Sequence, residues 1–173
     1  MHGPSILKKK IMSIIKAQFD LHTSLFNNCM EGISQDQAWE QTNDNHNPFI
    51  WLAGHLVGTR MGMSQFGGFE PDTSFDGFFG HDQKLDKSKT YPTLAKIKAA
   101  WNEISPKISA GLANLPAEAW GGLPPSKVPI SDDTMEGFMA FIMHHEAYHL
   151  GQMGILRKQV GLEAMSYKIK ETA

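Results

Sequence analysis

The sequence predicts an all-α fold, a four-helix bundle that forms a single domain over residues 1–173. Three observations support this fold class. Apolar residues recur at steps of three and four over four long stretches, Gly and Pro residues separate these stretches, and no stretch alternates apolar and polar residues as a half-buried strand does. A chain of this length buries a full core without covalent help, so one domain is expected.

The first helix is expected over residues 5–30, where the apolar residues follow one helical face. Gly32 comes directly after this stretch and is expected to stop the helix. The residues that set the period are Leu7, Ile11, Ile14, Ile15, Leu25 and Cys29. The pattern therefore predicts a long amphipathic helix with one buried face.

The second helix is expected to begin with Asn47 as its N-cap and Pro48 at its first helical position. An Asn side chain accepts a hydrogen bond from an unpaired amide of the first turn, and proline there loses no helical hydrogen bond. The apolar period continues to about Phe66, and Gly67 and Gly68 are expected to end the helix.

A crossover over residues 69–90, without a clean period, leads to a third helix that starts near Pro92. The apolar period of this helix continues to Leu112. Pro106 lies within it and is expected to kink the helix or to break it into two pieces, because proline removes one helical hydrogen bond. A loop rich in Pro and Gly follows over residues 121–129.

The fourth helix is expected to begin near Ser131 or Asp132, whose side chains and acidic neighbours suit a helix N-terminus. It continues to Val160, and Gly161 is expected to stop it. Four helices joined in part by a long crossover make a bundle in which sites are built from inward-facing side chains.

Two segments between the helices resemble each other, residues 33–39 and residues 115–120. Both end in an Ala-Trp pair, Ala38-Trp39 in the first and Ala119-Trp120 in the second, and each is expected to form a short helical turn. Two helix-pair halves related by approximate symmetry would explain the likeness, and so would chance similarity of two short polar turns. Both explanations stay open.

Charge and cysteine content limit the classes of function. The formal net charge of -2 is close to neutral and the basic residues are scattered, so neither nucleic acid nor an anionic membrane is an expected partner. The apolar stretch after Lys8, Lys9 and Lys10 is too short and too polar for a signal peptide or a membrane span. A single cysteine, Cys29, makes no internal disulfide and suits a reducing compartment, so a cytoplasmic location is expected.

The most informative pattern is the pair His145 and His149 within the fourth predicted helix. Four residues turn about 40° around a helix, so both imidazoles leave the same face one turn apart. On a helical wheel this face carries Phe138, Phe141, Ile142, His145, His149, Gln152, Met153 and Leu156. Two histidines on one buried face each need a polar partner, and a shared metal ion satisfies both more simply than separate core hydrogen bonds do.

A third ligand is expected from the middle of the second helix, at His55. Gly54, Gly58 and Gly62 follow at steps of four beside it, and such small residues let another helix approach closely. Three neutral imidazoles leave a position for water or substrate, as catalytic zinc sites do. The donor set itself does not distinguish zinc, nickel, copper and iron.

Two alternative metal chemistries fit the sequence less well. His145-Glu146-x-x-His149 matches the pattern of zinc peptidases, but Glu146 lies about 100° around the helix from His145 and no downstream motif supplies a third peptidase ligand. A di-iron bundle needs a Glu-x-x-His motif on each of two helices, and only the one ending at His149 is present. His144 points to a different face and is expected to pack or to hydrogen-bond at a helix interface.

Five further residues are candidates for the pocket around this site. Gln152 lies one turn beyond His149 and suits the role of orienting a bound water or a histidine ring; Tyr148 is a neighbour of the ligands. Gln18 and His22 place polar groups on the buried side of the first helix, where they line the pocket or make a structural hydrogen bond. Trp51 is expected to pack in the core more than to stack on substrate. The two long loops, residues 69–90 and 121–129, are expected to shape the pocket mouth, and His2, His46 and His81 are assigned no role.

The segments Trp51-Leu-Ala-Gly-His55-Leu56 and His145-Glu-Ala-Tyr-His149-Leu-Gly-Gln152, in this order and separation, resemble the DinB-like superfamily, also called the YfiT-like metal-dependent hydrolases. The resemblance implies an up-up-down-down four-helix bundle, often a homodimer. It also implies a divalent ion, such as zinc, nickel or iron, held by the residues matching His55, His145 and His149. Members with assigned activity include S-transferases and isomerases that use a low-molecular-weight thiol.

Two functions follow from these observations. The first is a metal-dependent transferase or hydrolase that acts on a small molecule, with a low-molecular-weight thiol as a possible co-substrate. The second is a non-catalytic, stress-associated bundle of the bacterial stress response that binds a metal or small ligand, and it is supported by the lack of a clear general base in the sequence.

Overall fold

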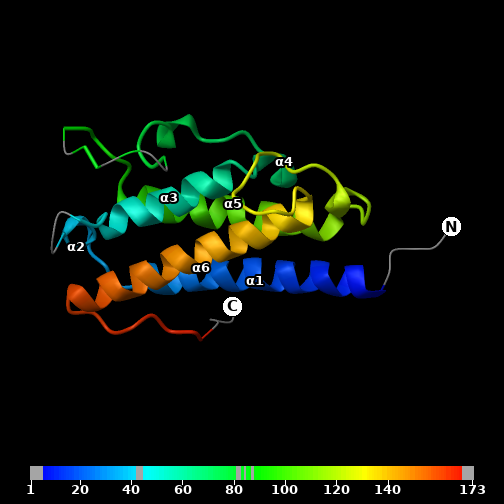
Figure 1. The fold of residues 1–173 in the computed structure, drawn as a ribbon. Helices are drawn as coiled ribbons and strands as arrows, with labels where there is room; N and C mark the ends of the chain where they lie inside the picture. Colours follow the sequence, from blue (N-terminus) through cyan, green and yellow to red (C-terminus); the bar gives the residue numbers. More distant parts are fainter. Residues whose placement is uncertain (1–5, 42–44, 81–82, 84, 87, 169–173) are drawn as a thin grey trace.

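The computed structural model of the protein describes residues 6–41, 45–80, 83, 85, 86 and 88–168, and over these residues it contains helices and no strands (Figure 1). Four long helices form the bundle: α1 (Ile6–Met30), α3 (Phe49–Met61), α5 (Leu94–Asn114) and α6 (Met135–Gln159). Short helices lie in the connections: α2 (Gln35–Trp39), α4 (Ser64–Gly67), η1 (Thr73–Phe75) and η2 (Ala119–Gly121). The predicted all-α class is confirmed.

The order of helix directions differs from the one that the resemblance implied. The contact of His22 with Glu146 and that of Cys29 with Arg157 advance together along α1 and α6, so these two helices are parallel. Figure 1 shows α3 and α5 running in the opposite direction. The bundle is therefore up-down-down-up, and the expected up-up-down-down order is wrong. The reason is that a short connection reverses the chain between α1 and α3, whereas the crossover joins the parallel pair α3 and α5, which pack together.

Each end of α1 and α3 follows from local chemistry. Gly32 adopts a left-handed φ of 73° and ends α1, as predicted; the expected start, Ser5, lies outside the described residues. Helix α3 begins at Phe49, because Pro48 has an extended ψ of 165°, which lies outside the helical range. Pro48 is thus the N-cap, and the expected capping by Asn47 is wrong by one residue. The predicted second helix is also interrupted, at Gly62, before α4.

The close approach in this region involves α4 and α5. A Cβ atom at Gly111 would lie 1.6 Å from the carbonyl oxygen of Phe66, so only glycine lets the two backbones meet there. Gly68, which follows α4, adopts a left-handed φ of 62° and ends the helical stretch as predicted. Helix α4 packs against α5, and this packing accounts for the break in the second predicted helix after Gly62.

Pro106 does not break α5, which runs continuously from Leu94 after the N-cap Thr93. Buried residues on both sides of the proline, Trp101 and Ile104 before it and Ile108 after it, hold the two halves in one helix by packing. Tertiary packing therefore outweighs the one hydrogen bond that proline removes.

Helix α6 begins three or four residues later than expected, at Met135. The hydroxyl of Thr134 accepts a hydrogen bond from the amide of Gly137 and caps the helix. The carboxylate of Asp132 in turn accepts hydrogen bonds from the amide and hydroxyl of Thr134, so it shapes the turn before the helix. Gly161, with φ of 81°, ends α6 as predicted.

The two Ala-Trp segments both form the short helical turns that were predicted, α2 and η2. In η2 the tryptophan is the anchor, since Trp120 is buried. In α2 the alanine is fully buried instead, and Trp39 is half-buried. Among the described helices, none combines the length and the apolar character that a membrane span requires.

Candidate metal centre

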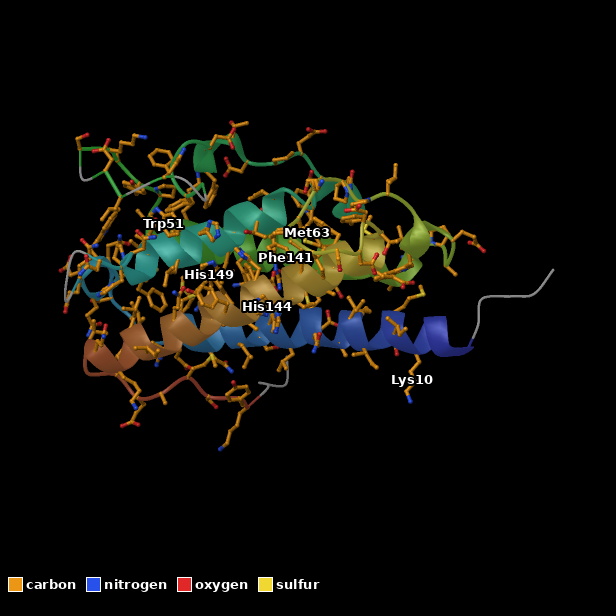
Figure 2. All side chains as sticks on the ribbon, viewed as in Figure 1. Lys10, Trp51, Met63, Phe141, His144 and His149 are labelled. Carbon is orange, nitrogen blue, oxygen red and sulfur yellow. The ribbon has the colours of Figure 1, made fainter. Side chains whose placement is uncertain are left out.

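Three histidines from two helices converge at one point of the bundle. His55 lies in the middle of α3, and His145 and His149 lie one turn apart on α6. One ring nitrogen of each lies within 4.8 Å of the others, and Nε2 of His55 lies 3.1 Å from Nε2 of His145. Figure 2 shows His149 on the side of α6 that faces α3. The structure thus brings together the three residues expected to be ligands.

The outward nitrogens of two of these rings are held by hydrogen bonds. Nδ1 of His55 donates to the backbone carbonyl of Phe79 at 2.6 Å, and Nδ1 of His149 donates to the side-chain oxygen of Gln152 at 2.7 Å. Because a carbonyl oxygen only accepts, each Nδ1 carries the proton and each Nε2 carries a lone pair. Such partners fix the tautomer and the ring orientation that metal coordination requires.

Gly54 serves this arrangement in a way that the sequence did not indicate. A Cβ atom at Gly54 would lie 2.4 Å from the ring of Phe79, so glycine lets the crossover sit directly against α3 and offer its carbonyl to His55. The space beside Gly58 is open, and Gly62 is the C-cap of α3. The expectation that these glycines let another helix approach is wrong, because the one tight neighbour is the crossover.

The two histidines of α6 are half-buried, and not in the core as the helical wheel predicted. Their face lies at the edge of the buried surface: Phe138, Ile142, Met153 and Leu156 are buried, whereas Phe141, His145, His149 and Gln152 are half-buried. A cavity of about 450 Å³ adjoins the cluster and is lined by His55 and His149, so these side chains are not enclosed on all sides by protein. This volume lies within the range of small-molecule sites.

The cavity is lined by residues of α3, α6 and the segment before α3. These residues are Asn45, His46, Asn47, Trp51, Leu52, His55, Tyr148, His149, Gln152, Ile155, Leu156 and Gln159. Of the two loops expected at the mouth, residues 69–90 and 121–129, the described residues supply none of the lining. Residues 45–47 line the cavity instead, and they include His46, to which sequence reasoning gave no role. The only signal in the sequence for their place at the cavity was that they come just before the first turn of α3.

Trp51 and Tyr148 contact different histidines of the cluster. Trp51 is 4% exposed and stacks on His55, with ring centroids 5.1 Å apart and planes 11° from parallel. Trp51 thus packs in the core, as expected, and its stacking also holds the ring of His55 in place. Tyr148 is 59% exposed and contacts His149 edge to face at a centroid distance of 5.1 Å. Both residues line the cavity, as does Gln152.

Gln18 and His22 do not line this cavity. They border a separate depression between α1 and α6 together with His144, which is exposed and lies toward α1 in Figure 2. Nδ1 of His22 lies 3.1 Å from a carboxylate oxygen of Glu146, which is the structural hydrogen bond that was the other expectation. The placement near the three histidines is wrong because α1 packs against the face of α6 that carries Glu146, so His22 meets this carboxylate instead. His144 lies at the interface of α1 and α6, as expected, but its side chain is exposed.

A buried ion pair between Arg60 of α3 and Glu146 of α6 was not predicted. Nε and Nη2 of Arg60 donate to the two carboxylate oxygens at 2.7 and 2.9 Å. The remaining donor capacity goes to Thr23, Ser105 and the carbonyl of Phe19, so the guanidinium joins all four long helices. The single charge of Arg60 within the strongly apolar stretch of α3 was the sequence signal that could have revealed the pair.

The environment of Glu146 decides against its use as a general base. Burial would raise the pKa of this carboxyl, but the charge and hydrogen bonds of Arg60, with a contribution from His22, hold the pKa below its ordinary value. Both oxygens accept hydrogen bonds from Arg60, and the side chain is fully buried. The zinc-peptidase interpretation therefore has no available carboxylate at this position.

Comparison with known families gives one match. Residues 18–153, which include all three histidines and most of the chain, match the model of the DinB superfamily. The chain matches none of the curated proteins at a significant level.

Proposed function

The chain belongs to the DinB superfamily, and from this premise we propose that it is a metal-dependent enzyme whose His55, His145 and His149 bind one divalent ion. The substrate is a small molecule in the adjoining cavity, and the reaction is of the thiol S-transferase type or a hydrolysis. The observation that carries this proposal is the convergence of three imidazole nitrogens within 4.8 Å of one another beside a cavity of about 450 Å³.

The donor set fits a metal ion. Hydrogen bonds to Phe79 and Gln152 leave Nε2 of His55 and of His149 as lone-pair donors toward the cluster. Neutral imidazoles suit zinc, nickel and iron, so the identity of the ion does not follow from the ligands. Three protein ligands leave a coordination position for an exogenous molecule, and the cavity borders two of the three histidines.

Bound at this position, a divalent ion lowers the pKa of a coordinated thiol or water and thereby supplies a nucleophile at neutral pH. The residues of the chain supply the setting. Trp51 covers one face of His55 and limits the access of water to it, while Gln152 holds His149 in orientation. Tyr148 and Ile155 form an exposed rim where a substrate enters.

The metal site is tested by elemental analysis of protein purified without an affinity tag and without added metal. We expect about one ion per chain in the wild type and a loss of at least about tenfold in occupancy for His55→Ala. His144→Ala is the matched control, because this exposed histidine lies on the same helix outside the cluster. Equal metal content in the wild type and His55→Ala would contradict the ligand assignment.

Activity is tested separately with the metal-loaded protein. Transfer of a low-molecular-weight thiol to an electrophile, or hydrolysis of a small ester or amide, is expected to depend on the ion and to be lost in His149→Ala. Stoichiometric metal without turnover in either assay would favour the stress-associated binding protein. The single domain over residues 1–173, the homodimer and the cytoplasmic location stay predictions.

A further inference from the structure

The cavity beside the three histidines is built from neutral groups. One wall is apolar, formed by Trp51 and Leu52 of α3 and by Ile155 and Leu156 of α6. The polar part of the lining carries the amides of Asn45, Asn47, Gln152 and Gln159 and the imidazole of His46. None of the lining residues in the described part of the chain is an Asp, Glu, Lys or Arg. The cavity therefore offers packing and hydrogen bonds, and its one strong charge would be the metal ion.

This composition limits the charge that a ligand can carry. A divalent ion held by three neutral imidazoles carries two positive charges, so one of them remains at the ion after an anionic donor atom, such as a thiolate, binds to it. A second negative charge farther along the ligand would lose its hydration without meeting a cation in the lining. The buried guanidinium of Arg60 already donates to Glu146, Thr23, Ser105 and the carbonyl of Phe19, and that of Arg157 donates to backbone carbonyls.

Trp51 adds a specific feature to the apolar wall. Its indole Nε1 is buried and has no acceptor among the described residues, while the ring is fixed by stacking on His55. A buried N–H without a partner is costly, and an acceptor on a ligand in the cavity would supply the partner. Nε1 of Trp120 also lacks an acceptor, but Trp120 is not among the residues that line the cavity.

We propose that this cavity takes an electrically neutral ligand with an apolar part of about aryl size and uncharged polar groups, and that it discriminates against ligands with a carboxylate or phosphate remote from the metal-binding atom. The inference rests on the proposed metal site and specifies its substrate class. The apolar part of the ligand lies against Leu52, Ile155 and Leu156, and its uncharged polar groups meet the side-chain amides of the lining. Low-molecular-weight thiols that carry several carboxylates are disfavoured by the same reasoning.

The test compares two probes of nearly equal shape, 4-(sulfanylmethyl)benzamide and 4-(sulfanylmethyl)benzoate, on the full chain loaded with Co²⁺. Thiol binding is followed through the absorption spectrum of the cobalt ion. We expect the benzamide to bind at least about tenfold more tightly than the benzoate. Equal affinity, or a preference for the benzoate, in protein with one cobalt ion per chain would overturn the neutral-ligand proposal and leave the metal site standing.

A failure of the metal site gives a different result. If Co²⁺ produces no spectrum of imidazole coordination, or the same spectrum in His149→Ala, the proposed function fails and this inference fails with it. A binding measurement on the metal-free protein adds an independent readout: benzamide itself is expected to quench tryptophan fluorescence in the wild type more strongly than benzoate does. The opposite order would also overturn the proposal.

Two variants that add a positive charge test whether the lining causes the preference for the neutral ligand. Gln159→Lys places a cation at the cavity rim and is expected to improve benzoate binding by at least about fivefold. Gln65→Lys is the matched control, since it adds the same charge at an exposed position of α4 outside the lining. Equal effects of the two variants would overturn the role of the lining. Trp51→Phe keeps an aromatic ring without the N–H and is expected to weaken benzamide binding by about threefold to tenfold.

Discussion

Two polar clusters join the same pair of helices, and they use their hydrogen-bonding groups differently. Arg60 and Glu146 are both fully buried, and their donors and acceptors are engaged within the protein. His55, His145 and His149 turn one nitrogen each toward a common point beside a cavity. The two clusters also differ in burial, since His145 and His149 are only half-buried. The distinction between a functional polar cluster and a structural one lies in whether the cluster directs its lone pairs to its own scaffold or to a shared point open to a ligand.

The largest effect is expected at the structural cluster. Glu146→Ala leaves the guanidinium of Arg60 buried without its counter-charge, which typically costs about 3–5 kcal/mol. Urea unfolding of the metal-free protein measures this loss. Glu103→Ala is the control, because its pair with Lys107 is exposed and its removal is expected to change stability by less than about 1 kcal/mol. A loss of the same small size for Glu146→Ala would contradict the structural role.

The isosteric Glu146→Gln variant sharpens this result. It keeps the shape and one acceptor for Arg60, so it is expected to fold at low temperature and to retain about one metal ion per chain. Loss of metal from folded Glu146→Gln would show that the two clusters are one functional unit and would break the comparison.

The second effect concerns stability that depends on the ion. Zinc at about one hundred times its dissociation constant is expected to raise the free energy of unfolding by about 2.7 kcal/mol in the wild type. His149→Ala is expected to abolish this increase and to change the metal-free protein by less than about 1 kcal/mol, because His149 is only half-buried. Thermal unfolding with and without zinc measures both quantities, with His144→Ala as the control. A metal-free loss as large as that of Glu146→Ala would make the histidines core residues.

The histidine cluster was predictable from sequence because its geometry is local. A spacing of four residues places His145 and His149 on one helical face whatever the rest of the fold does, and His55 stood alone as a mid-helix histidine on a second helix. The ion pair was not found because Arg60 and Glu146 lie 86 positions apart, and a single charge on a wheel indicates a solvated face.

Misplacement of His22 has a different cause. A helical wheel gives the angle at which a side chain leaves its own helix, but it does not say which neighbouring helix lies there. The true packing puts α1 against the Glu146 side of α6, so His22 meets that carboxylate and not the histidines. Likewise the carbonyl of Phe79 and residues 45–47 come from irregular segments, whose paths depend on tertiary contacts that no period in the sequence records.

The third effect concerns the side chain that orients a ligand. Gln152→Ala removes the acceptor of the Nδ1 proton of His149 and is expected to weaken metal binding by about tenfold to a hundredfold. Gln152→Glu keeps an acceptor and is expected to bind metal at least as tightly as the wild type. Competition with a chromophoric chelator measures the affinities. Equal affinity of Gln152→Ala and the wild type would contradict the orienting role, while the fold of both variants is checked by far-UV circular dichroism.

The smallest effect is expected at Cys29, a buried thiol that belongs to neither the ion pair nor the histidine cluster. Burial raises the pKa of the Cys29 thiol to about 12, against a smaller opposing effect of Arg157. Because the folded pKa is raised, the neutral thiol favours folding fully below about pH 8.5, and this contribution is lost as pH rises toward 12. Urea midpoints at pH 8, 9 and 10 should therefore fall more steeply in the wild type than in Cys29→Ala, by about 1–2 kcal/mol at pH 10. Parallel pH dependences would show that the thiolate is tolerated in the fold. In the expected case, the contribution of Cys29 to stability is set by pH. The contribution of the ion pair is set by its counter-charge, and that of the histidines by a bound ion.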